Sequence, residues 1–490
     1  MNRITIDLDR QLGQISPNIF GGFVEHLGRC IYGGIYEPQS PHADENGFRK
    51  DVLTALRRLN MPIIRYPGGN FASGYRWRDG VGPRAERPAR PELAWHTLES
   101  NQIGTNEFVD FCRLVNTQPF FVVNAGDGDM REARDWVEYC NGNNDTALVK
   151  LRRQHGYDAP HRVQYWGIGN EVDGHWQIGY KTASEYARTF TEFGKVMKWA
   201  DPEIKLIASM TSDWGIDWVE RAQLLIEQAG NLVDYMGIHW YVGNNGDNFA
   251  NYMTVSEMIE ERLSAYEGLI RMLCLQEKIP QPIPLAVDEW NVWYRTHPEY
   301  VEDLKRLEEI YNLEDALVVA MHLNAFIRHA HSVRMANLAQ IVNVIAPIFT
   351  SPEGLVLQTI FYPFELYSRT CGSMALDVFW KCDTFSGGAY TGVRLLDVSA
   401  TLDEGEQTLT VFAVNRSQSE AIETTISLEC GCFSGPVRAY VVNGSDIKAS
   451  NTFENPHRVG TSETEYEASD ETTFTYTFEP HSVTALVFAL

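Results

Sequence analysis

The sequence lacks an excess of basic residues. Lysine and arginine number 41 against 65 aspartate and glutamate residues, which gives a formal net charge of −24 and a pI near 5.0. We therefore expect no nucleic acid and no anionic membrane as partner, because both would be repelled. A polyanionic substrate would be repelled as well, whereas a neutral carbohydrate would not.

Long apolar runs are missing, and cysteine is sparse. No run of about 20 apolar residues is present, so we expect no membrane span. The first residues, MNRITIDLDRQLGQ, lack the apolar core of a signal peptide, and we expect a cytoplasmic protein. Eight cysteines are scattered over 490 residues, and a chain of this size can build its core without disulfides. Free thiols are the simplest expectation.

Groups of metal-ligating residues are scarce too. Cys430 and Cys432 are too closely spaced for an ordinary zinc-ligand pair. His329 and His331 form the only tight histidine pair, and residues two apart on a helix face different directions. We therefore predict no metal and no cofactor. No GxGxxG turn follows a strand, which disfavours an open dinucleotide-binding sheet.

Short apolar runs alternate with longer segments of helical period between about Ile19 and Ser368. The clearest helical patterns are Gly47–Leu59, Lys181–Ala200, Trp218–Ala229, Val255–Leu275 and Asp315–Ala330. Eight βα units predict an α/β fold, a closed (β/α)8 TIM barrel with its catalytic residues at the C-terminal ends of the strands. We place these ends near Glu25, Gly69, Asp127, Glu171, Met210, Val242, Trp293 and Val342.

From about Cys371 the pattern changes to short alternating runs separated by Gly, Asn, Ser and Asp. This predicts an all-β, antiparallel C-terminal β-sandwich. The opening run RITIDLDRQLGQISP alternates in the same way. We therefore predict a catalytic barrel over 18–370 and a sandwich over 371–490, with 1–17 contributing a strand to it. The sandwich holds one tryptophan, Trp380, and we assign it a structural role rather than sugar binding.

Two glutamates at predicted strand ends carry the chemistry. Glu171 lies in YWGIGNEVDGHW and Glu289 in IPLAVDEWNVWY. Strands four and seven face each other across a barrel mouth, so the two carboxyls can converge on one bond. Hydrolysis of a glycosidic bond requires such a pair, one to protonate the leaving oxygen and one to attack or stabilise the sugar cation. The alternative for a single rim glutamate is capping of the next helix.

The register of the seventh strand decides which acid faces the barrel axis. Side chains alternate along a strand, so Leu285, Val287 and Glu289 share one face. Asp288 then points toward the helix layer. We assign the reactive carboxylate to Glu289 and a structural hydrogen bond or ion pair to Asp288.

Other predicted strand ends also carry polar groups, and their joint occurrence favours a binding site. Arg65 can instead form a structural ion pair, His239 can be a buried imidazole, and Gln340 can plug the barrel. Tryptophans are candidates for stacking on sugar faces, with core packing as the alternative for each. The polar candidates are Glu25, Arg65, Asn70, His239, Tyr241 and Gln340, of which His239 and Tyr241 share one face of their strand. The tryptophans are Trp95, Trp176, Trp290 and Trp293.

Long runs in this chain resemble family 51 glycoside hydrolases of the α-L-arabinofuranosidase type. The resemblance implies a barrel with a jelly-roll sandwich, a retaining mechanism and a carbohydrate substrate. It also implies a homo-oligomer, specifically a hexamer. The matching runs, in the family's order, are GGFVEHLGRCIYGGIYEP, RYPGGNFASGYRWRDGVGP, GNEVDGHWQIG, DEWNVWY, ANLAQIVNVIAPI and the final HSVTALVF.

The resemblance also implies residue roles. Glu171 matches the acid/base and Glu289 the nucleophile, with Arg65 and Tyr241 as neighbours of the nucleophile. The positions that match hydrogen-bonding partners of the terminal sugar are Glu25, Asn70, Asn170, Tyr241 and Gln340, and those that match aromatic walls are Trp95 and Trp293.

The implied activity is release of terminal α-L-arabinofuranosyl residues from arabinan, arabinoxylan or their oligosaccharides. A retaining endo-β-glucanase or β-xylosidase would use the same two carboxylates. A non-catalytic carbohydrate-binding protein is the alternative from another class, and the acid pair speaks against it. Many family members read Met-Asp-Gly-Pro-Trp after the acid/base, whereas this chain reads Val-Asp-Gly-His-Trp. His175 therefore leaves the leaving-group preference open.

Overall fold

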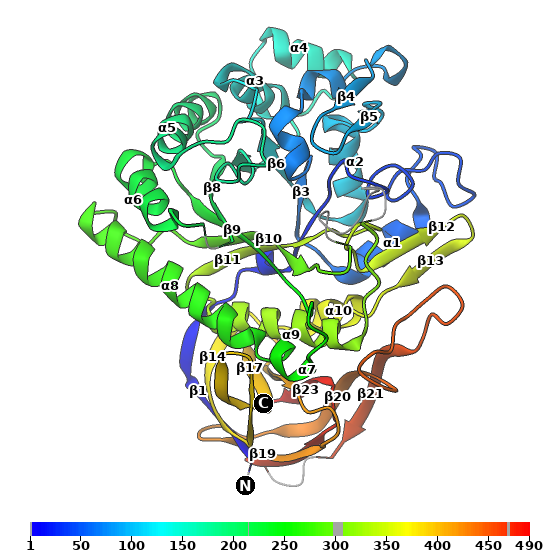
Figure 1. Cartoon of the computed structure of the whole chain (residues 1–490), viewed down its shortest axis with the longest axis vertical. Helices are drawn as coiled ribbons and strands as arrows, with labels where there is room; N and C mark the ends of the chain where they lie inside the picture. Colours follow the sequence, from blue (N-terminus) through cyan, green and yellow to red (C-terminus); the bar gives the residue numbers. More distant parts are fainter. Residues whose placement is uncertain (1, 214, 297–306, 468–470) are drawn as a thin grey trace.

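A closed barrel forms the upper part of the computed structural model, which describes residues 2–213, 215–296, 307–467 and 471–490 (Figure 1). Within these ranges eight parallel strands close in the order β10-β11-β2-β3-β6-β7-β8-β9. Each ends within four residues of the predicted position, so the predicted TIM barrel is confirmed. The strands are β2 (Gly21–Phe23), β3 (Ile63–Tyr66), β6 (Gln118–Val123), β7 (Tyr165–Ile168), β8 (Lys205–Ser212), β9 (Tyr235–Val242), β10 (Leu285–Val292) and β11 (Val333–Ala339).

Helices cover the outside of the barrel (Figure 1). Capping boxes begin two of them: Thr182 and Glu185 at α5, and Asn312 and Asp315 at α9. Each box satisfies backbone N–H groups that have no partner within the helix. The helices are α1 (Lys50–Leu59), α2 (Thr105–Val115), α3 (Met130–Asn141), α4 (Ala147–Gln154), α5 (Ala183–Ala200), α6 (Trp218–Ala229), α7 (Phe249–Tyr252), α8 (Val255–Gln276), α9 (Leu313–Arg328) and α10 (Phe361–Thr370).

Short 3₁₀ helices and two-stranded hairpins lie between these longer elements. They are the 3₁₀ helices η1 (Pro17–Phe20), η2 (Asn70–Gly74), η3 (Trp77–Gly80) and η4 (Arg84–Glu86), and the hairpins β4–β5 (Arg90–Glu92, Thr97–Glu99), β12–β13 (Ile348–Ser351, Gly354–Leu357) and β15–β16 (Thr384–Gly387, Tyr390–Arg394).

The all-β part forms one sheet with the order β21-β20-β23-β18-β17-β14-β1-β19-β22. The sheet folds over on itself, because the rings of Tyr466 on β21 and Phe474 on β22, its two edge strands, lie 6.2 Å apart. β1 pairs antiparallel with β14 but parallel with β19, an exception to the predicted antiparallel pairing. The strands are β1 (Arg3–Gln14), β14 (Met374–Lys381), β17 (Leu396–Asp403), β18 (Thr408–Asn415), β19 (Ile422–Leu428), β20 (Ser434–Gly444), β21 (Val459–Tyr466), β22 (Thr473–Phe478) and β23 (Val483–Ala489).

Both chain ends lie in the sandwich, which has a hydrophobic core of its own (Figure 1). Ile4 and Ile6 of β1 are fully buried in that core. We propose on this basis that 1–17 and 371–490 form one domain and 18–370 the other.

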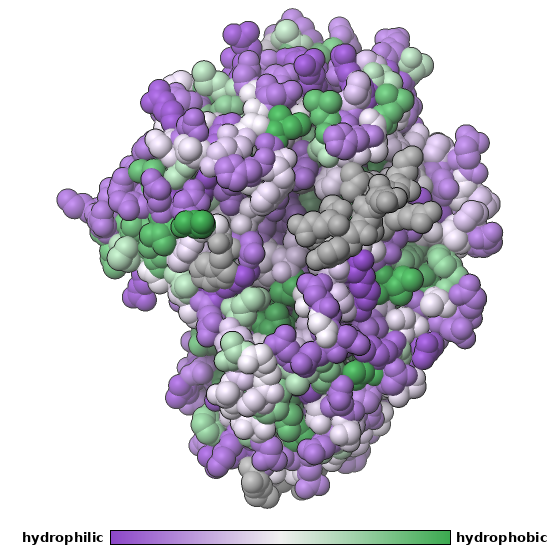
Figure 2. All heavy atoms as spheres, in the orientation of Figure 1, coloured by the Kyte–Doolittle hydropathy of each residue, from purple (hydrophilic) through white to green (hydrophobic). Residues whose placement is uncertain are grey.

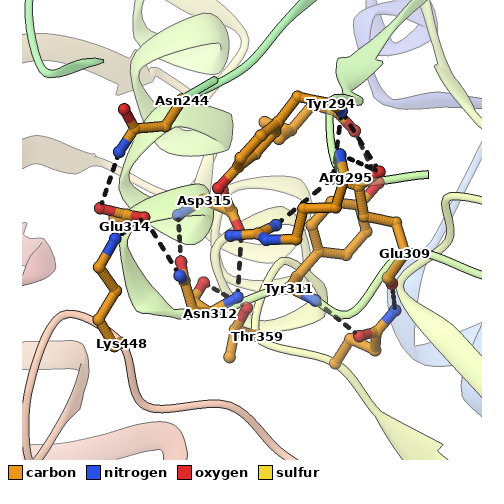
Figure 3. Close-up of polar contacts among 12 residues, drawn as sticks. Asn244, Tyr294, Arg295, Glu309, Tyr311, Asn312, Glu314, Asp315, Thr359 and Lys448 are labelled. Atoms are coloured by element: carbon orange, nitrogen blue, oxygen red, sulfur yellow. Dashed lines mark hydrogen bonds and ion pairs between the residues drawn. The ribbon is translucent and has the colours of Figure 1, made fainter. Parts of the chain in front are cut away.

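Helices α9 and α10 lie between the barrel and the sandwich (Figure 1). Every α9 residue from Leu313 to Ile327 is buried, because the helix packs on β10 on one side and on β17 and β18 on the other. Arg328 at its end forms ion pairs with Glu260 of α8 at 2.7 Å and with Asp397 of β17 at 2.9 Å. Near its start, Lys448 from the sandwich binds Glu314 at 2.7 Å (Figure 3).

The outer surface is mostly hydrophilic on the face shown in Figure 2, in keeping with the high charge of the chain. Among the helices that the structure describes, none is both long and apolar enough to cross a bilayer. All eight cysteines lie in the described ranges and are free thiols, as predicted.

Candidate active site

The predicted acid/base, Glu171, lies just beyond the end of β7. The chain turns sharply there, with left-handed backbone at Gly169 (φ +79) and at Glu171 itself (φ +41). A non-glycine residue rarely adopts this conformation, and such backbone strain is concentrated at functional sites. The turn places the Glu171 carboxylate at the mouth of the barrel, with its side chain 13% exposed.

Two ring nitrogens hold the Glu171 carboxylate. Oε1 lies 3.1 Å from His239 Nδ1, and Oε2 accepts a hydrogen bond of 3.1 Å from Trp176 Nε1. Burial raises the pKa of Glu171, and the charge of Glu289 raises it further. Glu171 therefore keeps its proton to a higher pH than an ordinary glutamate.

Glu289 on β10 lies in a more polar setting. Tyr241 Oη donates to its Oε1 at 2.7 Å, and Arg65 Nη1 donates to its Oε2 at 2.8 Å. Its Oε2 also lies 3.5 Å from His239 Nδ1, the atom that contacts Glu171. One oxygen of each glutamate and this nitrogen thus lie within 4.8 Å of one another.

The predicted register of β10 is wrong. Ala286, not Leu285 or Val287, belongs to the small apolar cluster inside the barrel, which contains residues of β3, β6, β8 and β11. The strict alternation fails because β10 carries a bulge: Ala286 pairs with Gly237 and Glu289 with His239, so three steps on β10 match two on β9. A bulge of this kind lets consecutive side chains share a face.

Asp288 consequently points to the site together with Glu289, not toward the helices. Its carboxylate lies 3.4 Å from Arg65 Nε and 3.3 Å from His239 Nε2. The part of the prediction that gave Asp288 an ion pair is confirmed by these contacts.

His239 lies between the carboxylates of Glu171, Asp288 and Glu289, and it is 3% exposed. Burial disfavours its charged form, but the negative charges of Glu289 and Asp288 prevail and raise the pKa of His239 to about 10. A cation at this position lowers the cost of holding several carboxylates in a buried site.

Glu25 follows β2 and is buried at the same end of the barrel. Its Oε1 accepts hydrogen bonds from Phe71 N at 3.0 Å and Trp95 Nε1 at 2.8 Å. Its Oε2 accepts from Gln340 Nε2 at 3.3 Å. Burial raises the pKa of Glu25 to about 7 despite these hydrogen bonds.

The groups converge above Gly69. A Cβ on this residue would lie 3.4 Å from Glu25 Oε2, 3.5 Å from Asn170 Nδ2 and 3.5 Å from Glu289 Oε2. Asn170 accepts a 2.6 Å hydrogen bond from Arg65, while its buried Nδ2 has no partner among the residues that the structure describes. The arrangement offers donors and acceptors to a small polyhydroxylated ligand.

The predicted asparagine Asn70 and three of the predicted tryptophans differ in burial and in the contacts that they make. Asn70 accepts a hydrogen bond from Gln177. Trp293 packs edge-on against Tyr241, with ring centroids 5.1 Å apart. Trp176 is 63% exposed at the rim. Trp290 is completely buried against α9, so sugar stacking is wrong for this residue.

Sequence reasoning missed Gln177 and Asp173. Gln177 joins Asn70 to Ser73, and Asp173 accepts hydrogen bonds from Ser212 N and Oγ at 2.7 and 2.9 Å. Both residues belong to the run GNEVDGHWQIG, which already contained the signal. They hold the loop after β7 that carries Glu171.

Comparison with known proteins gives consistent matches along the chain. Residues 55–260 match the α-L-arabinofuranosidase 1 domain, and residues 288–482 match the α-L-arabinofuranosidase C-terminal domain. An intracellular exo-α-(1→5)-L-arabinofuranosidase of Bacillus subtilis is 41% identical over 476 residues, which cover 94% of each chain.

Solved structures agree with this. The α-L-arabinofuranosidase of Thermotoga maritima, crystallised with arabinose, superposes with a TM-score of 0.93 at 37% identity and full coverage of both chains. A family 51 α-L-arabinofuranosidase of Bifidobacterium longum superposes with a TM-score of 0.92 at 32% identity, again over both full chains. The chain therefore belongs to the α-L-arabinofuranosidases of glycoside hydrolase family 51.

Proposed function

We propose that this enzyme removes terminal α-L-arabinofuranosyl residues from arabinan, arabinoxylan or their oligosaccharides, with retention of configuration. The observation that carries the mechanism is the closeness of Glu171 and Glu289, whose nearest oxygens lie within 4.8 Å. Retaining glycosidases hold their carboxyl groups about 5–5.5 Å apart, and inverting ones about 6.5–9.5 Å apart to admit a water. The relatives named as arabinofuranosidases support the sugar.

In the first step the Glu289 carboxylate attacks C1 of the arabinofuranosyl residue and forms a glycosyl ester. The bond from C1 to the glycosidic oxygen breaks, and Glu171 donates its proton to that oxygen. In the second step Glu171 takes a proton from water, the resulting hydroxide attacks C1, and Glu289 leaves as a carboxylate.

The same contacts explain how Glu171 changes role between the steps. The charge of Glu289 is one cause of the raised pKa of Glu171, and this charge disappears when Glu289 is esterified. His239 lowers the pKa of Glu171 and stays beside it. Glu171 is therefore an acid before the ester forms and a base afterwards.

The alternative substrates are less well supported. An endo-β-glucanase would need an open cleft, whereas Trp95, held by Glu25, and Trp293, packed on Tyr241, lie at the sides of this site.

The substrate prediction is tested with nitrophenyl glycosides compared side by side. We expect α-L-arabinofuranoside to be cleaved at least about 100-fold faster, in kcat/KM, than β-xyloside or β-cellobioside, since a site that hydrogen-bonds one sugar's hydroxyls leaves polar groups unpaired with another. Preference for either β-glycoside would overturn this assignment.

The two glutamates are distinguished by azide rescue. In Glu171→Ala, a dinitrophenyl arabinofuranoside should still form the ester, because its leaving group needs little protonation, and the ester should accumulate as a burst. Azide should then release a glycosyl azide of retained configuration. In Glu289→Ala, azide enters in place of the nucleophile and should give the inverted product. Both variants should lose about 10²–10⁴-fold or more in kcat on natural substrates.

Glu203→Ala is the matched control, because Glu203 is exposed and precedes β8 at the other end of the barrel. It should keep full activity. If Glu171→Ala gave the inverted azide and Glu289→Ala the retained one, Glu171 would be the nucleophile and Glu289 the acid/base. Loss of ester formation in Asp288→Ala but not in Glu289→Ala would move the nucleophile to Asp288.

The pH dependence of kcat/KM should be bell-shaped. Glu289 must be ionised, which gives the acid limb, and Glu171 must be protonated, which gives the alkaline limb. Because the pKa of Glu171 is raised, its proton is lost only as the pH rises well above the usual range of a glutamate. In Glu171→Gln the alkaline limb should vanish from the residual activity on an activated substrate. If the alkaline limb were unchanged in Glu171→Gln, another group would be responsible for it, and Glu25 would be the first candidate.

We further propose that the enzyme works in the cytoplasm as a homo-oligomer, specifically a hexamer. The name of the Bacillus subtilis relative, which describes an intracellular enzyme, supports the location. Exposed apolar side chains on neighbouring helices support assembly, among them Trp199 of α5, Val219 of α6 and Leu275 of α8. Light scattering of the purified chain should give six times the mass of 55.6 kDa, and a monomer would contradict the proposal.

A further inference from the structure

A second group of titratable side chains lies at the opposite end of the barrel from the two glutamates. Glu260 and Glu267 come from α8, His329 follows α9, and His331 precedes β11. Since β11 begins at Val333, the group lies at the N-terminal end of the strands, whereas catalysis takes place at their C-terminal ends.

The geometry of the two histidines differs from the sequence prediction. That prediction placed both on one helix, where residues two apart diverge. The helix α9 ends at Arg328, and His329 is its C-cap (φ −97, ψ 25), so His331 lies outside the helix. The two rings instead lie side by side, with centroids 5.9 Å apart and planes inclined by 31°.

Both rings reach the same carboxylate. His329 Nδ1 lies 3.0 Å from Glu267 Oε2, and His331 Nε2 lies 2.7 Å from Glu267 Oε1. The three ligand atoms all lie within 4.8 Å of one another. One ion placed between them can contact all three.

We propose that Glu267, His329 and His331 form a Zn²⁺ site remote from the two glutamates. Two imidazole nitrogens and one carboxylate oxygen are a common set of three zinc ligands, with water in the fourth position. Nitrogen donors suit zinc, whereas Mg²⁺ and Ca²⁺ prefer sites made of oxygen alone. The sequence argument against this histidine pair assumed a helix geometry that does not exist here.

The surroundings of His329 resemble the outer shell of a zinc site. Its second ring nitrogen, Nε2, lies 2.9 Å from Glu260, and Glu260 accepts a 2.8 Å hydrogen bond from Arg328 Nε. Zinc-bound histidines usually donate their other N–H to a carboxylate in this way, which fixes the tautomer and the ring orientation. The ligand Glu267 is itself held by Ser332 Oγ at 3.1 Å.

An entry path and room for water are present. A cavity of about 280 Å³ is lined by Glu267, His331 and Ser332, and the His331 side chain is 43% exposed. His329 is by contrast 8% exposed, so one ligand is anchored and another is accessible. Solvent therefore reaches this group of side chains, so a water can complete the coordination of an ion bound there.

Protons compete with the metal at this site. Zinc binds imidazole through a nitrogen lone pair, so affinity should fall as the pH is lowered. Without metal, the same side chains form ion pairs.

The site would brace three elements, because its ligands come from α8, the end of α9 and the segment before β11. Arg328, the partner of Glu260, also binds Asp397 of the sandwich. Zinc should accordingly stabilise the fold and leave kcat on arabinofuranosides unchanged, because the ion would not approach Glu171 or Glu289.

The test is titration of the chelator-treated full-length enzyme with ZnCl₂ at pH 7.5 in a calorimeter. We expect one zinc ion per chain, a rise in Tm with zinc, and unchanged kcat. Co²⁺ bound in place of zinc should give visible absorption bands typical of nitrogen and oxygen ligands in four- or five-fold coordination. Absence of zinc binding by the wild-type enzyme, or loss of activity that zinc restores after chelation, would overturn the proposal.

Variants of the proposed site test which side chains bind the zinc ion. His331→Ala should abolish the binding, and its half-exposed side chain makes misfolding a minor concern. Glu260→Gln should keep the stoichiometry of one but weaken binding about 10–100-fold, as outer-shell changes do. His457→Ala is the matched control, because His457 is exposed on the sandwich, and it should bind zinc like the wild type. Equal binding by His331→Ala and the wild type would place the zinc elsewhere.

Discussion

The buried Arg65 guanidinium is the interaction on which the active site depends. It is 1% exposed, lies over the Phe23 ring at 4.6 Å, and contacts Asp288, Glu289 and Asn170. Three carboxylates, Asp288, Glu289 and Glu171, meet at this end of the barrel. Burying one unpaired charge costs several kcal/mol, so a site of this kind is stable only with compensating cations. Arg65 and the protonated His239 supply them, and each also fixes the orientation of the carboxylates that it contacts.

The two glutamates acquire different roles from their neighbours. Glu289 accepts hydrogen bonds from a permanent cation and from Tyr241, which stabilise the carboxylate that must attack. Glu171 has no arginine contact among the described residues, and its burial and the nearby charge of Glu289 raise its pKa. Two chemically identical side chains thus differ through environment alone, in the way that the proposed acid and nucleophile roles require. Asp288 completes the arrangement, since its charge helps to keep His239 protonated.

Sequence patterns predicted the barrel because eight apolar runs alternate with helical periods, and every such run became a strand. They also predicted which residues stand at the strand ends, since this position follows directly from the end of each run. They failed where the backbone departs from regularity. The bulge in β10 depends on how that strand pairs with β9, which no single-strand pattern contains. The end of α9 before His329 and the burial of Trp290 depend likewise on tertiary packing, as does the loop held by Gln177 and Asp173.

The sandwich contacts the barrel through charged side chains. Its tryptophan, Trp380, is covered by the Arg394 guanidinium at 4.3 Å and donates to Leu396 O, so it offers no free platform. Lys448 instead neutralises Glu314, which is fully buried at the start of α9 and also contacts Asn244 just beyond β9 (Figure 3).

In the same region Arg295, just beyond β10, binds Asp315 at 3.0 Å, and the buried Glu309 accepts hydrogen bonds from the backbone of Tyr294 and Arg295 (Figure 3). Glu309 also accepts a hydrogen bond from the backbone of Thr296. β9 carries His239 and Tyr241 and β10 carries Glu289, so this network fixes the ends of the strands that hold these three side chains. Removing Lys448 would leave Glu314 as a buried negative charge with only neutral partners among the described residues. A cation from the sandwich is therefore part of what holds the catalytic rim of the barrel in place.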